Sequence, residues 1–396
     1  MTITLIIYWL AVSTSLALAL PIGLLAVEVA IACVVRRQNC RPLVKQPPQT
    51  AILIPAHNEE QVIAVMLSGL RDTLRGDERI VVVADNCTDR TASIARSLGA
   101  EVLERQNDQL RGKGFALDYG IKHLDKKPPE VLVVLDADCV VSQDAVAHLA
   151  YEAQVTCRPV QALYLCYSPS VDDPKTAISA LAFQFKNQIR PLGLSSLGGP
   201  GYLTGSGMAI PWNLVKSVPW ATGNVVEDMQ LGIDYALAGF SPRYFDGSQV
   251  HSPLPTEATA ANKQRTRWEH GHLRTLLGQC PRLLATAVRE CRWELLLLAL
   301  DLAIPPLALL ATFWVCGLLT TVVAAIVVGV FWPLELTVGL GILLFTSVVA
   351  GWAFFCSQNI PWRTMLAVPG YVAGKLSIYR RFLGQPQQEW VRTERS

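Results

Sequence analysis

The sequence predicts an α/β fold with a mainly parallel β-sheet, flanked along the chain by transmembrane α-helices. Two observations predict this fold. Short apolar runs rich in β-branched residues alternate with helical patterns in the middle of the 396-residue chain, and long apolar blocks precede and follow them. Only 17% of the residues are charged. Soluble domains carry about 25% charged residues, so part of the chain is expected in lipid.

The first apolar block, residues 3–35, is longer than the roughly 20 residues that span a bilayer. Its only charged residue is Glu28, and Pro21 is a candidate kink. No basic residue precedes the block, so residues 1–37 are predicted to be a retained anchor rather than a signal peptide. Four basic residues follow it: Arg36, Arg37, Arg41 and Lys45. By the positive-inside rule, this end of the anchor is expected in the cytoplasm.

The second apolar block, residues 293–357, is predicted to hold the C-terminal transmembrane helices. Its first part contains the pair Pro305-Pro306, which a regular helix does not tolerate in its interior. We therefore expect a broken or interfacial helix, followed by spans near 309–330 and 335–356. Residues 358–396 are a predicted amphipathic, basic tail on the cytoplasmic side. The chain is thus expected to be an integral protein of the plasma or inner membrane.

The segment from residue 48 to 280 has the pattern of a separate domain. Three of its runs are predicted strands: 50–56, 79–85 and 130–138. Three segments between them have helical patterns: 59–74, 88–98 and 113–124. Nearly continuous apolar strands that alternate with helices predict a parallel sheet covered on both faces.

Polar residues stand at the end of each predicted strand, where parallel sheets bind their ligands. They are His57, Asn58 and Glu59 after the first strand, Asp85 and Asn86 after the second, and Asp136 and Asp138 at the end of the third. Each set alone is also explained by helix capping or a tight turn, and that interpretation stays open. No GxGxxG follows the first strand and no GxxxxGK[ST] occurs, so a dinucleotide site and a P-loop lack support.

The ordered segments ILIPAHNEE, VVADNCTDRT, RGKGFAL, LDADC, GSGMAI, VVEDMQLG and QRTRW resemble the family 2 glycosyltransferases, which have the Rossmann-like GT-A fold. They are most similar to the membrane branch with the cellulose, chitin-oligosaccharide and hyaluronan synthases and ceramide glucosyltransferase. The resemblance covers about residues 50–275, and the flanking apolar blocks suit this branch. It implies an enzyme that takes a sugar from a nucleotide-sugar donor.

The resemblance implies a metal and donor site at the aspartates of LDADC. Mg²⁺ and Mn²⁺ prefer carboxylate oxygens and retain phosphate ligands, so either ion suits a diphosphate donor. Asp138 is the implied metal ligand, and Asp136 the implied contact to the sugar or ribose. Asp85 corresponds to a contact to the base or ribose. The family's usual second acid is replaced here by Ala84, so a UDP-sugar is expected but not required.

Further donor contacts are implied at the end of the first strand and in RGKGFAL. Pro55, Ala56, Asn58 and Glu59 would line the nucleotide. Lys113 lies between two glycines, and flexible backbone with a cation suits a phosphate or base contact. A solvated surface loop is the alternative that stays open for Lys113.

Residues 224–240 are predicted to form a helix that begins near Glu227, with Leu231 and Tyr235 at helical spacing. The resemblance makes Glu227 and Asp228 catalytic, with Asp228 as the general base that takes the proton of the acceptor hydroxyl. Direct attack on the anomeric carbon would then invert its configuration. Acids in a first helical turn also favour the helix dipole, so a structural role stays open.

The segment QRTRW lies on a predicted amphipathic helix of residues 261–279. Arg267 and Trp268 follow Gln264 by three and four residues, so all three share one helix face. The resemblance implies that Gln264 and Arg267 bind the leaving pyrophosphate, for which a guanidinium is suited, and that Trp268 stacks on the acceptor. Anchoring at the membrane surface is the alternative.

The resemblance as a whole implies a membrane-bound, inverting hexosyltransferase with a cytoplasmic catalytic domain. The expected partners are the donor, a lipid or lipid-linked saccharide acceptor, the membrane, and an oligomer or envelope-assembly proteins. A net charge of +2 gives no basis for a nucleic-acid partner. A processive polysaccharide synthase is the first alternative, disfavoured because about three spans are too few for a channel. A catalytically silent scaffold is the remote one.

Overall fold

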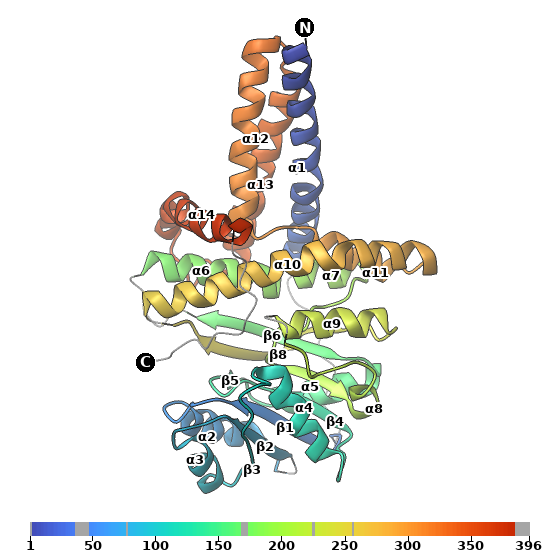
Figure 1. Ribbon diagram of the computed structural model, residues 1–396, viewed down its shortest axis with the longest axis vertical. Coiled ribbons are helices and arrows are strands. Elements are labelled where there is room, and N and C mark those ends of the chain that lie inside the picture. Colours follow the sequence, from blue (N-terminus) through green and yellow to red (C-terminus); the bar gives the residue numbers. More distant parts are fainter. Residues whose placement is uncertain are drawn as a thin grey trace. The chain divides into compact units, whose positions relative to one another are not determined.

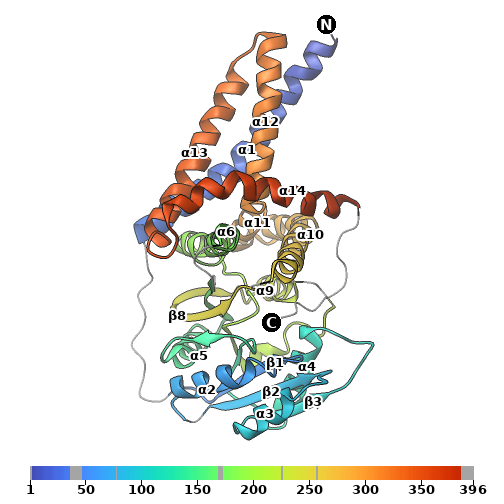
Figure 2. The ribbon, with the colours of Figure 1, turned by 90° about the vertical axis from the view of Figure 1, so that its left-hand side faces the viewer.

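The computed structural model describes residues 2–35, 47–76, 78–167, 173–223, 226–255 and 257–384 (Figures 1 and 2). The chain divides into two compact units. We call them the membrane unit, formed by Met1–Arg36, Val171–Leu197 and His272–Pro386, and the sheet unit, formed by Arg37–Ser170, Gly198–Gly271 and Gln387–Ser396.

The sheet unit is built on one eight-stranded sheet with the order β3-β2-β1-β4-β7-β6-β8-β5. The strands are β1 (Thr50–Ala56), β2 (Arg79–Asp85), β3 (Glu101–Arg105), β4 (Val131–Val134), β5 (Val140–Val141), β6 (Val160–Tyr167), β7 (Met208–Pro211) and β8 (Arg243–Pro253). β3, β2, β1 and β4 run parallel, whereas β7 is antiparallel to both β4 and β6. This mostly parallel sheet confirms the predicted α/β fold.

The predicted strands 50–56 and 79–85 are confirmed as β1 and β2. The predicted strand 130–138 is wrong in its second half, because β4 ends at Val134. Beyond this point the amide of Asp136 donates to the hydroxyl of Ser206 at 3.0 Å, so a side-chain contact replaces the strand ladder. Both aspartates therefore lie in the loop between β4 and β5.

The helices of the sheet unit are α2 (Ile63–Thr73), α3 (Thr91–Ser97), α4 (Lys113–Leu124), α5 (Ala145–Thr156), α8 (Trp212–Val215) and α9 (Glu227–Leu237). The four predicted helices of this region are confirmed as α2, α3, α4 and α9. α2 begins later than predicted, because Asn58 has a φ of 55° and the carbonyl oxygen of Glu59 accepts from the amides of Val62 and Ile63 in a preceding turn.

The core of the sheet unit holds these strand ends in place. Leu53, Val83 and Leu132 of three adjacent strands are fully buried and pack in one cluster with Leu117 of α4 and Tyr235 of α9. Burying one such side chain stabilises the fold by about 1.5–3 kcal/mol. The starts of α4 and α9 are therefore fixed on the same rigid sheet as the loops that follow β1, β2 and β4.

The membrane unit contains α1 (Thr2–Val35), α6 (Pro174–Gln184), the π-helix η1 (Phe185–Ile189), α7 (Arg190–Ser196), α11 (Trp293–Leu302), α12 (Leu307–Val328), α13 (Trp332–Phe355), the 3₁₀-helix η2 (Trp362–Ala367) and α14 (Val368–Gly384). Among the described residues, α1, α12 and α13 are long and apolar enough to cross a membrane. They lie side by side (Figures 1 and 2).

The predicted long apolar helices are confirmed as α1, α12 and α13, and the predicted break lies between Leu302 and Leu307, where the two adjacent prolines stand. The basic residues that predicted the orientation, Arg36, Arg37, Arg41 and Lys45, lie outside the described residues, as do positions 385–396 of the predicted tail.

A buried ionic group joins three helices of the membrane unit. The guanidinium of Arg190 on α7 donates to the Glu28 carboxylate on α1 at 3.2 Å and to the Asp301 carboxylate on α11 at 2.8 Å. It also donates to the carbonyl oxygen of Asp301 at 2.7 Å. All three side chains are at most 7% exposed.

The helix α10 (Ala258–Glu290) is longer than the predicted 261–279. The prediction ended before Pro281, because proline usually ends or bends a helix. The buried face continues beyond this proline with Leu283 and Ala287, and the helix continues with it. Residues up to Gly271 belong to the sheet unit.

Candidate active site

The loop after β4 carries the two aspartates of the predicted metal site. Oxygen and sulfur atoms of Asp136, Asp138 and Cys139 lie within 4.8 Å of one another, close enough to hold a metal ion. Asp138 is 8% exposed, whereas Asp136 is more open. The buried thiol of Cys139 lies 3.0 Å from the hydroxyl of Ser206 and 3.0 Å from that of Ser252, which fixes the loop from behind.

Lys113, the first residue of α4, reaches this loop. Its ammonium group forms an ion pair with Asp136 and donates to the carbonyl oxygen of Gly205 at 2.7 Å. Burial alone would lower the pKa of Lys113, but the nearby carboxylates of Asp136, Glu227 and Asp228 outweigh it and raise the pKa above its usual value. Lys113 is therefore a fixed positive charge inside the site and not a solvated surface residue.

The start of α9 brings Glu227 and Asp228 to the same place. A Cβ atom added at Gly205, which has a φ of 92°, would lie 3.0 Å from an oxygen of Asp228 and 3.2 Å from the nitrogen of Lys113. The amide of Met229 donates to the Asp228 carboxylate at 2.8 Å. Burial, with the neighbouring charge of Asp228, raises the pKa of Glu227 to about 7.

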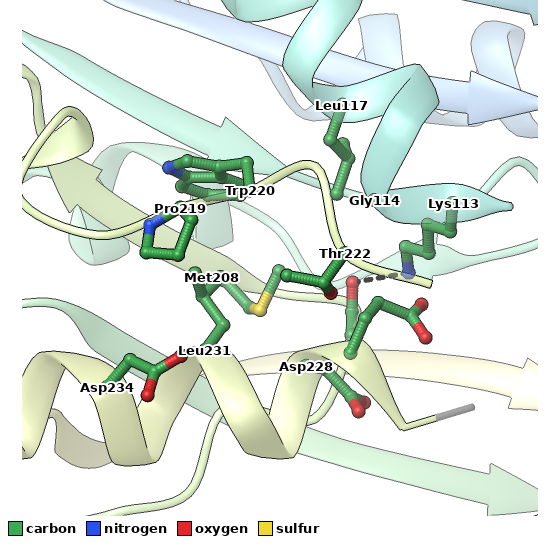
Figure 3. Close-up of a pocket in the computed structure, with 12 residues that line it drawn as sticks. Lys113, Gly114, Leu117, Met208, Pro219, Trp220, Thr222, Asp228, Leu231 and Asp234 are labelled. Carbon is green, nitrogen blue, oxygen red and sulfur yellow. Dashed lines mark hydrogen bonds between the residues drawn. The ribbon is translucent and has the colours of Figure 1, made fainter. Parts of the chain in front are cut away.

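A small pocket borders this group. Figure 3 shows Lys113 and Asp228 at one end of it and Pro219 and Trp220 at the other. The remaining lining residues come mainly from α4, α9 and β7, and most of them are apolar. The site thus combines charged groups at its rim with an apolar interior, which is typical of small-molecule sites.

The three residues of the QRTRW segment lie on α10 within the sheet unit. Gln264 is buried, and Arg267 and Trp268 are half-buried. The positive charge of Arg267 acts on Glu227 and lowers its pKa against the effect of burial. The Nε atom of Arg267 is buried with no hydrogen-bond partner among the described residues. Arg267 is thereby brought to the Glu227 side of the site.

The end of β1 is tied to the loop after β2. The side-chain oxygen of Asn58 accepts from the amide of Thr88 at 2.7 Å, and the amide of Glu59 donates to the hydroxyl of Thr91 at 2.8 Å. Pro55 is half-buried and Ala56 is buried at the end of the strand. These contacts fix the backbone of the predicted nucleotide-lining segment.

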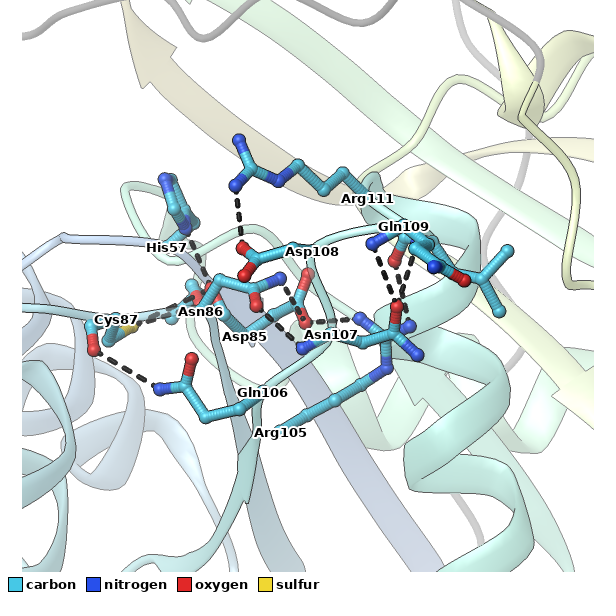
Figure 4. A network of polar contacts seen from close by, with 12 residues as sticks. His57, Asp85, Asn86, Cys87, Arg105, Gln106, Asn107, Asp108, Gln109 and Arg111 are labelled. Atoms are coloured by element: carbon cyan, nitrogen blue, oxygen red, sulfur yellow. Dashed lines mark hydrogen bonds and ion pairs between the residues drawn. The ribbon is translucent and has the colours of Figure 1, made fainter.

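The predicted base contact Asp85 is engaged within the protein (Figure 4). Its carboxylate accepts from Arg105 at 2.5 Å and from the side chain of Asn86 at 3.1 Å. Arg105 also donates to the carbonyl oxygen of Leu110 at 2.7 Å, and Asn86 accepts from the amide of Asn107 at 2.7 Å. The network holds the 105–110 loop against the end of β2 and leaves Asp85 only 7% exposed.

The charges around the pocket fit a divalent cation. Lys113 lies within electrostatic range of the carboxyl groups of Asp136, Glu227 and Asp228. A fourth carboxyl group, that of Asp138, lies beside Asp136, and a second cation, Arg267, acts on Glu227. Four minus two leaves a surplus of two negative charges when all groups are ionised. Hard oxygen ligands in such surplus suit Mg²⁺ or Mn²⁺.

The structure thus brings Lys113, Glu227 and Asp228 together in the lining of one pocket, and Asp136 joins them through its ion pair with Lys113. Asp85 and Asn58 belong to the separate network at the ends of β1 and β2. Sequence reasoning missed Arg105, Cys139 and the polar residues behind Gly205. Only the charge of Arg105, on an otherwise unremarked strand, could have signalled a partner for Asp85.

The fold and the site define a sugar-transferring enzyme of the GT-A class, and comparisons with known proteins identify the family. The model of glycosyl transferase family group 2 matches residues 131–374, and that of glycosyl transferase family 2 matches residues 51–200. The chain belongs to glycosyl transferase family group 2.

Two curated relatives and one solved structure illustrate the similarity. The chain is 25% identical over 256 residues to the probable glycosyltransferase YdaM of Bacillus subtilis, covering 59% of this chain and 57% of the relative. It is 25% identical over 250 residues to the probable glucomannan 4-beta-mannosyltransferase 15 of Arabidopsis thaliana, covering 57% and 44%. The chain thus spans about half the length of these curated relatives.

The solved structure is the mannosyltransferase PcManGT from Pyrobaculum calidifontis in complex with GDP-Man and Mn²⁺. The two chains are 18% identical, with a TM-score of 0.58, and the match covers 95% of this chain and 99% of the other. At this identity the likeness establishes the fold, and it confirms the GT-A class that the motifs predicted.

Proposed function

We propose that this protein is an inverting hexosyltransferase that moves a sugar from a nucleotide sugar to a lipid or lipid-linked saccharide at the cytoplasmic face of the plasma or inner membrane. The observation that carries the proposal is the position of Lys113, which contacts Asp136 and Gly205, while the Asp228 carboxylate lies against the same Gly205. One charged group thereby faces the donor side and the acceptor side of a single pocket.

The donor side is formed by the loop after β4. Asp138 would hold Mg²⁺ or Mn²⁺, and Asp136, oriented by Lys113, would contact the sugar or ribose. When bound, the ion would neutralise negative charge on the diphosphate as the sugar–phosphate bond breaks. Arg267 and Gln264 would bind the leaving pyrophosphate, for which the planar guanidinium offers two parallel donors.

The acceptor side is formed by the start of α9 and by α10. Asp228 would take the proton of the acceptor hydroxyl, whose oxygen then forms a bond to the anomeric carbon. The bond from that carbon to the diphosphate breaks on the opposite side, and the nucleoside diphosphate leaves. Glu227 would assist as the second acid of this turn, and Trp268 would stack on the acceptor.

The nucleotide would lie at the ends of β1 and β2. Pro55, Ala56, Asn58 and Glu59 would line it, with Asp85 at the base or ribose. A UDP-sugar is the first donor to test, on the family resemblance. GDP-mannose is the second, because the structural neighbour PcManGT is a mannosyltransferase with GDP-Man bound.

Single addition to a lipid is favoured over processive polymerisation by the three membrane-spanning helices found among the described residues. A channel for a polymer needs more helices than these, and an oligomer or a partner could add them. The name of the Arabidopsis relative refers to a polymer, so the processive alternative belongs in the same experiment.

The test uses the full-length protein in bilayer nanodiscs with a bacterial lipid extract, Mn²⁺ or Mg²⁺, and a panel of UDP- and GDP-sugars. We expect metal-dependent release of one nucleoside diphosphate and a lipid product heavier by one hexose in mass spectrometry. Asp228→Asn is the matched inactive control. A long polymer would replace single addition by the processive alternative, and no release from any donor would contradict the proposed function.

A further inference from the structure

The segment Thr204–Gly207 lies between the donor and acceptor sides of the site. The carbonyl oxygen of Gly205 accepts from Lys113 at 2.7 Å, and the Ser206 hydroxyl accepts from the amide of Asp136 at 3.0 Å. Gly205 lies against the Asp228 carboxylate, because a Cβ atom added at Gly205 would lie only 3.0 Å from an oxygen of Asp228. A displacement of this segment would therefore move Lys113, Asp136 and Asp228 relative to one another.

One side chain outside the pocket holds this segment. Gln161 on β6 is 2% exposed, and its amide nitrogen donates to the carbonyl oxygen of Ser206 at 2.8 Å. Its amide oxygen accepts from the backbone amide of Thr204 at 2.8 Å. The same nitrogen donates to the carbonyl oxygen of Ala162 at 2.9 Å.

The sheet explains why a side chain takes this role. β6 pairs with β7 at Val160 and Gln161, and the pairing extends to Gly207, whose φ is 71° and whose carbonyl oxygen accepts from the amide of Ala162 at 2.8 Å. The Gln161 side-chain amide then bonds to the backbone of Thr204 and Ser206, as a peptide group of a neighbouring strand would do. A glutamine side chain carries a donor and an acceptor at its end, as a peptide group does, whereas a methionine of the same length carries no comparable donor.

The segment has little freedom on its other side. A Cβ atom at Gly207 would lie 2.8 Å from a methyl carbon of Val250 and 2.9 Å from the Cβ of Ala162. The amide of Gly207 donates to the carbonyl oxygen of Val134 at 2.9 Å. One end of the segment is thus fixed by packing on the sheet, and the other end is fixed by Gln161.

We infer that Gln161 is a positioning residue for glycosyl transfer, which sets the distance between the donor loop at Asp136 and the base Asp228 through Thr204–Gly207. This inference rests on the proposed function. Gln161 does not line the pocket, so it acts through the segment and not on the substrate. Catalytic geometry tolerates little error, and a misplacement of about 1 Å costs about 100-fold in rate.

The experiment compares full-length wild type with Gln161→Met, which keeps the side-chain length and removes all three side-chain hydrogen bonds. We expect kcat to fall by about 100-fold, with the affinities for the donor and for Mn²⁺, measured by titration, within about threefold of wild type. Gln161→Glu is the second variant. Its carboxylate turns an acceptor toward the carbonyl oxygen of Ser206, so kcat should fall at least as far.

The matched control is Ser248→Ala. Ser248 on β8 is fully buried and donates to the carbonyl oxygen of Ala145 at 2.8 Å, away from the site. The Ser248→Ala variant should unfold at a lower temperature than wild type but keep kcat within about twofold.

A kcat of Gln161→Met within threefold of wild type would overturn the inference and leave the proposed function standing. Equal loss of kcat, donor affinity and Mn²⁺ affinity would also overturn it, because a merely structural role lowers all three through misfolding. If Gln161→Met does not fold, Gln161→Glu decides by the same criteria. No turnover by wild type with any donor would contradict the proposed function, and the inference with it.

Discussion

Two groups of charged side chains, one in each unit, are enclosed differently. In the membrane unit, the guanidinium of Arg190 forms ion pairs with Glu28 and Asp301, and all three side chains are at most 7% exposed. In the sheet unit, Lys113 and Asp136 are 16% and 27% exposed, and Lys113 lines a small pocket.

The difference separates a structural group from a catalytic one. Ionisable residues within membrane helices are often functional, but those around Arg190 bond to one another across three helices. The acids around Lys113 outnumber the cations and face a space that a ligand can enter. We therefore assign the Arg190 group to stability and the Lys113 group to chemistry, and substitutions in either unit test this comparison.

The largest expected effect is that of Asp228→Asn. Removal of a general base slows its step by about 10²–10⁴-fold, and we expect kcat to fall by about 1,000-fold. The amide keeps the size of the carboxylate, so the donor affinity should stay within about threefold. Steady-state kinetics and donor titration check both values. Asp234→Asn, at the far end of the same pocket, is the control, and equal turnover of Asp228→Asn and wild type would refute Asp228 as the base.

The next effect is one of stability and lies in the membrane unit. Arg190→Met leaves Glu28 and Asp301 buried without their cation, which should lower the free energy of unfolding by about 3–5 kcal/mol. Thermal unfolding in detergent measures this loss. Restoring neutrality in the combined variant Glu28→Gln/Arg190→Met/Asp301→Asn should recover most of it. A stable Arg190→Met variant with greatly reduced kcat would reverse our assignment of the two groups.

A smaller effect is expected for Lys113→Met, which removes the cation but keeps most of the side-chain volume. A hydrogen bond to a charged group contributes about 1.5–3 kcal/mol, so we expect kcat/KM to fall by about 30-fold. The loss should appear mainly as a higher KM for the donor, because Lys113 orients Asp136. Lys122→Met, which removes an exposed cation of the same helix, is the control. An unchanged donor KM in Lys113→Met would exclude this role.

The smallest effect concerns Glu227 and pH. Its folded pKa of about 7 lies above the usual 4.5, so the folded protein holds a proton between these values that the unfolded chain has lost. Stability therefore falls as pH rises from about 4.5 to 7, and Glu227→Gln should remove this part of the dependence. The kcat/KM profile of wild type should also carry an inflection near pH 7 that the variant lacks. Identical profiles would contradict a titrating Glu227.

The fold was predictable wherever a periodic apolar pattern spans a whole element. β1, β2, α4, α9 and the three membrane helices were predicted in this way. The end of β4 was not, because Leu135 and the alanine between the aspartates continue the apolar pattern although Asp136 bonds to Ser206. The second half of α10 was not predicted, because a proline such as Pro281 is typical of a helix end although this helix continues through it.

The site was predictable where one segment carries its own motif, as at Asp136, Asp138 and Asp228. Contacts between distant segments could not be predicted. Nothing around Gln161 indicates that its amide bonds to the backbone at Thr204 and Ser206, because such bonds depend on the pairing of β6 with β7. The pairing of Asp85 with Arg105 likewise depends on the register of β2 and β3.

The most direct test of the assignment is Mn²⁺ binding to the full-length protein, followed by electron paramagnetic resonance in the presence of the donor. Wild type should bind one Mn²⁺ per chain at the loop after β4. Asp138→Asn should weaken this binding by at least about tenfold, whereas Asp144→Asn, which alters a partly exposed acid paired with Arg75, should bind like wild type. Equal Mn²⁺ affinity in Asp138→Asn and wild type would contradict a metal-dependent donor site at these aspartates.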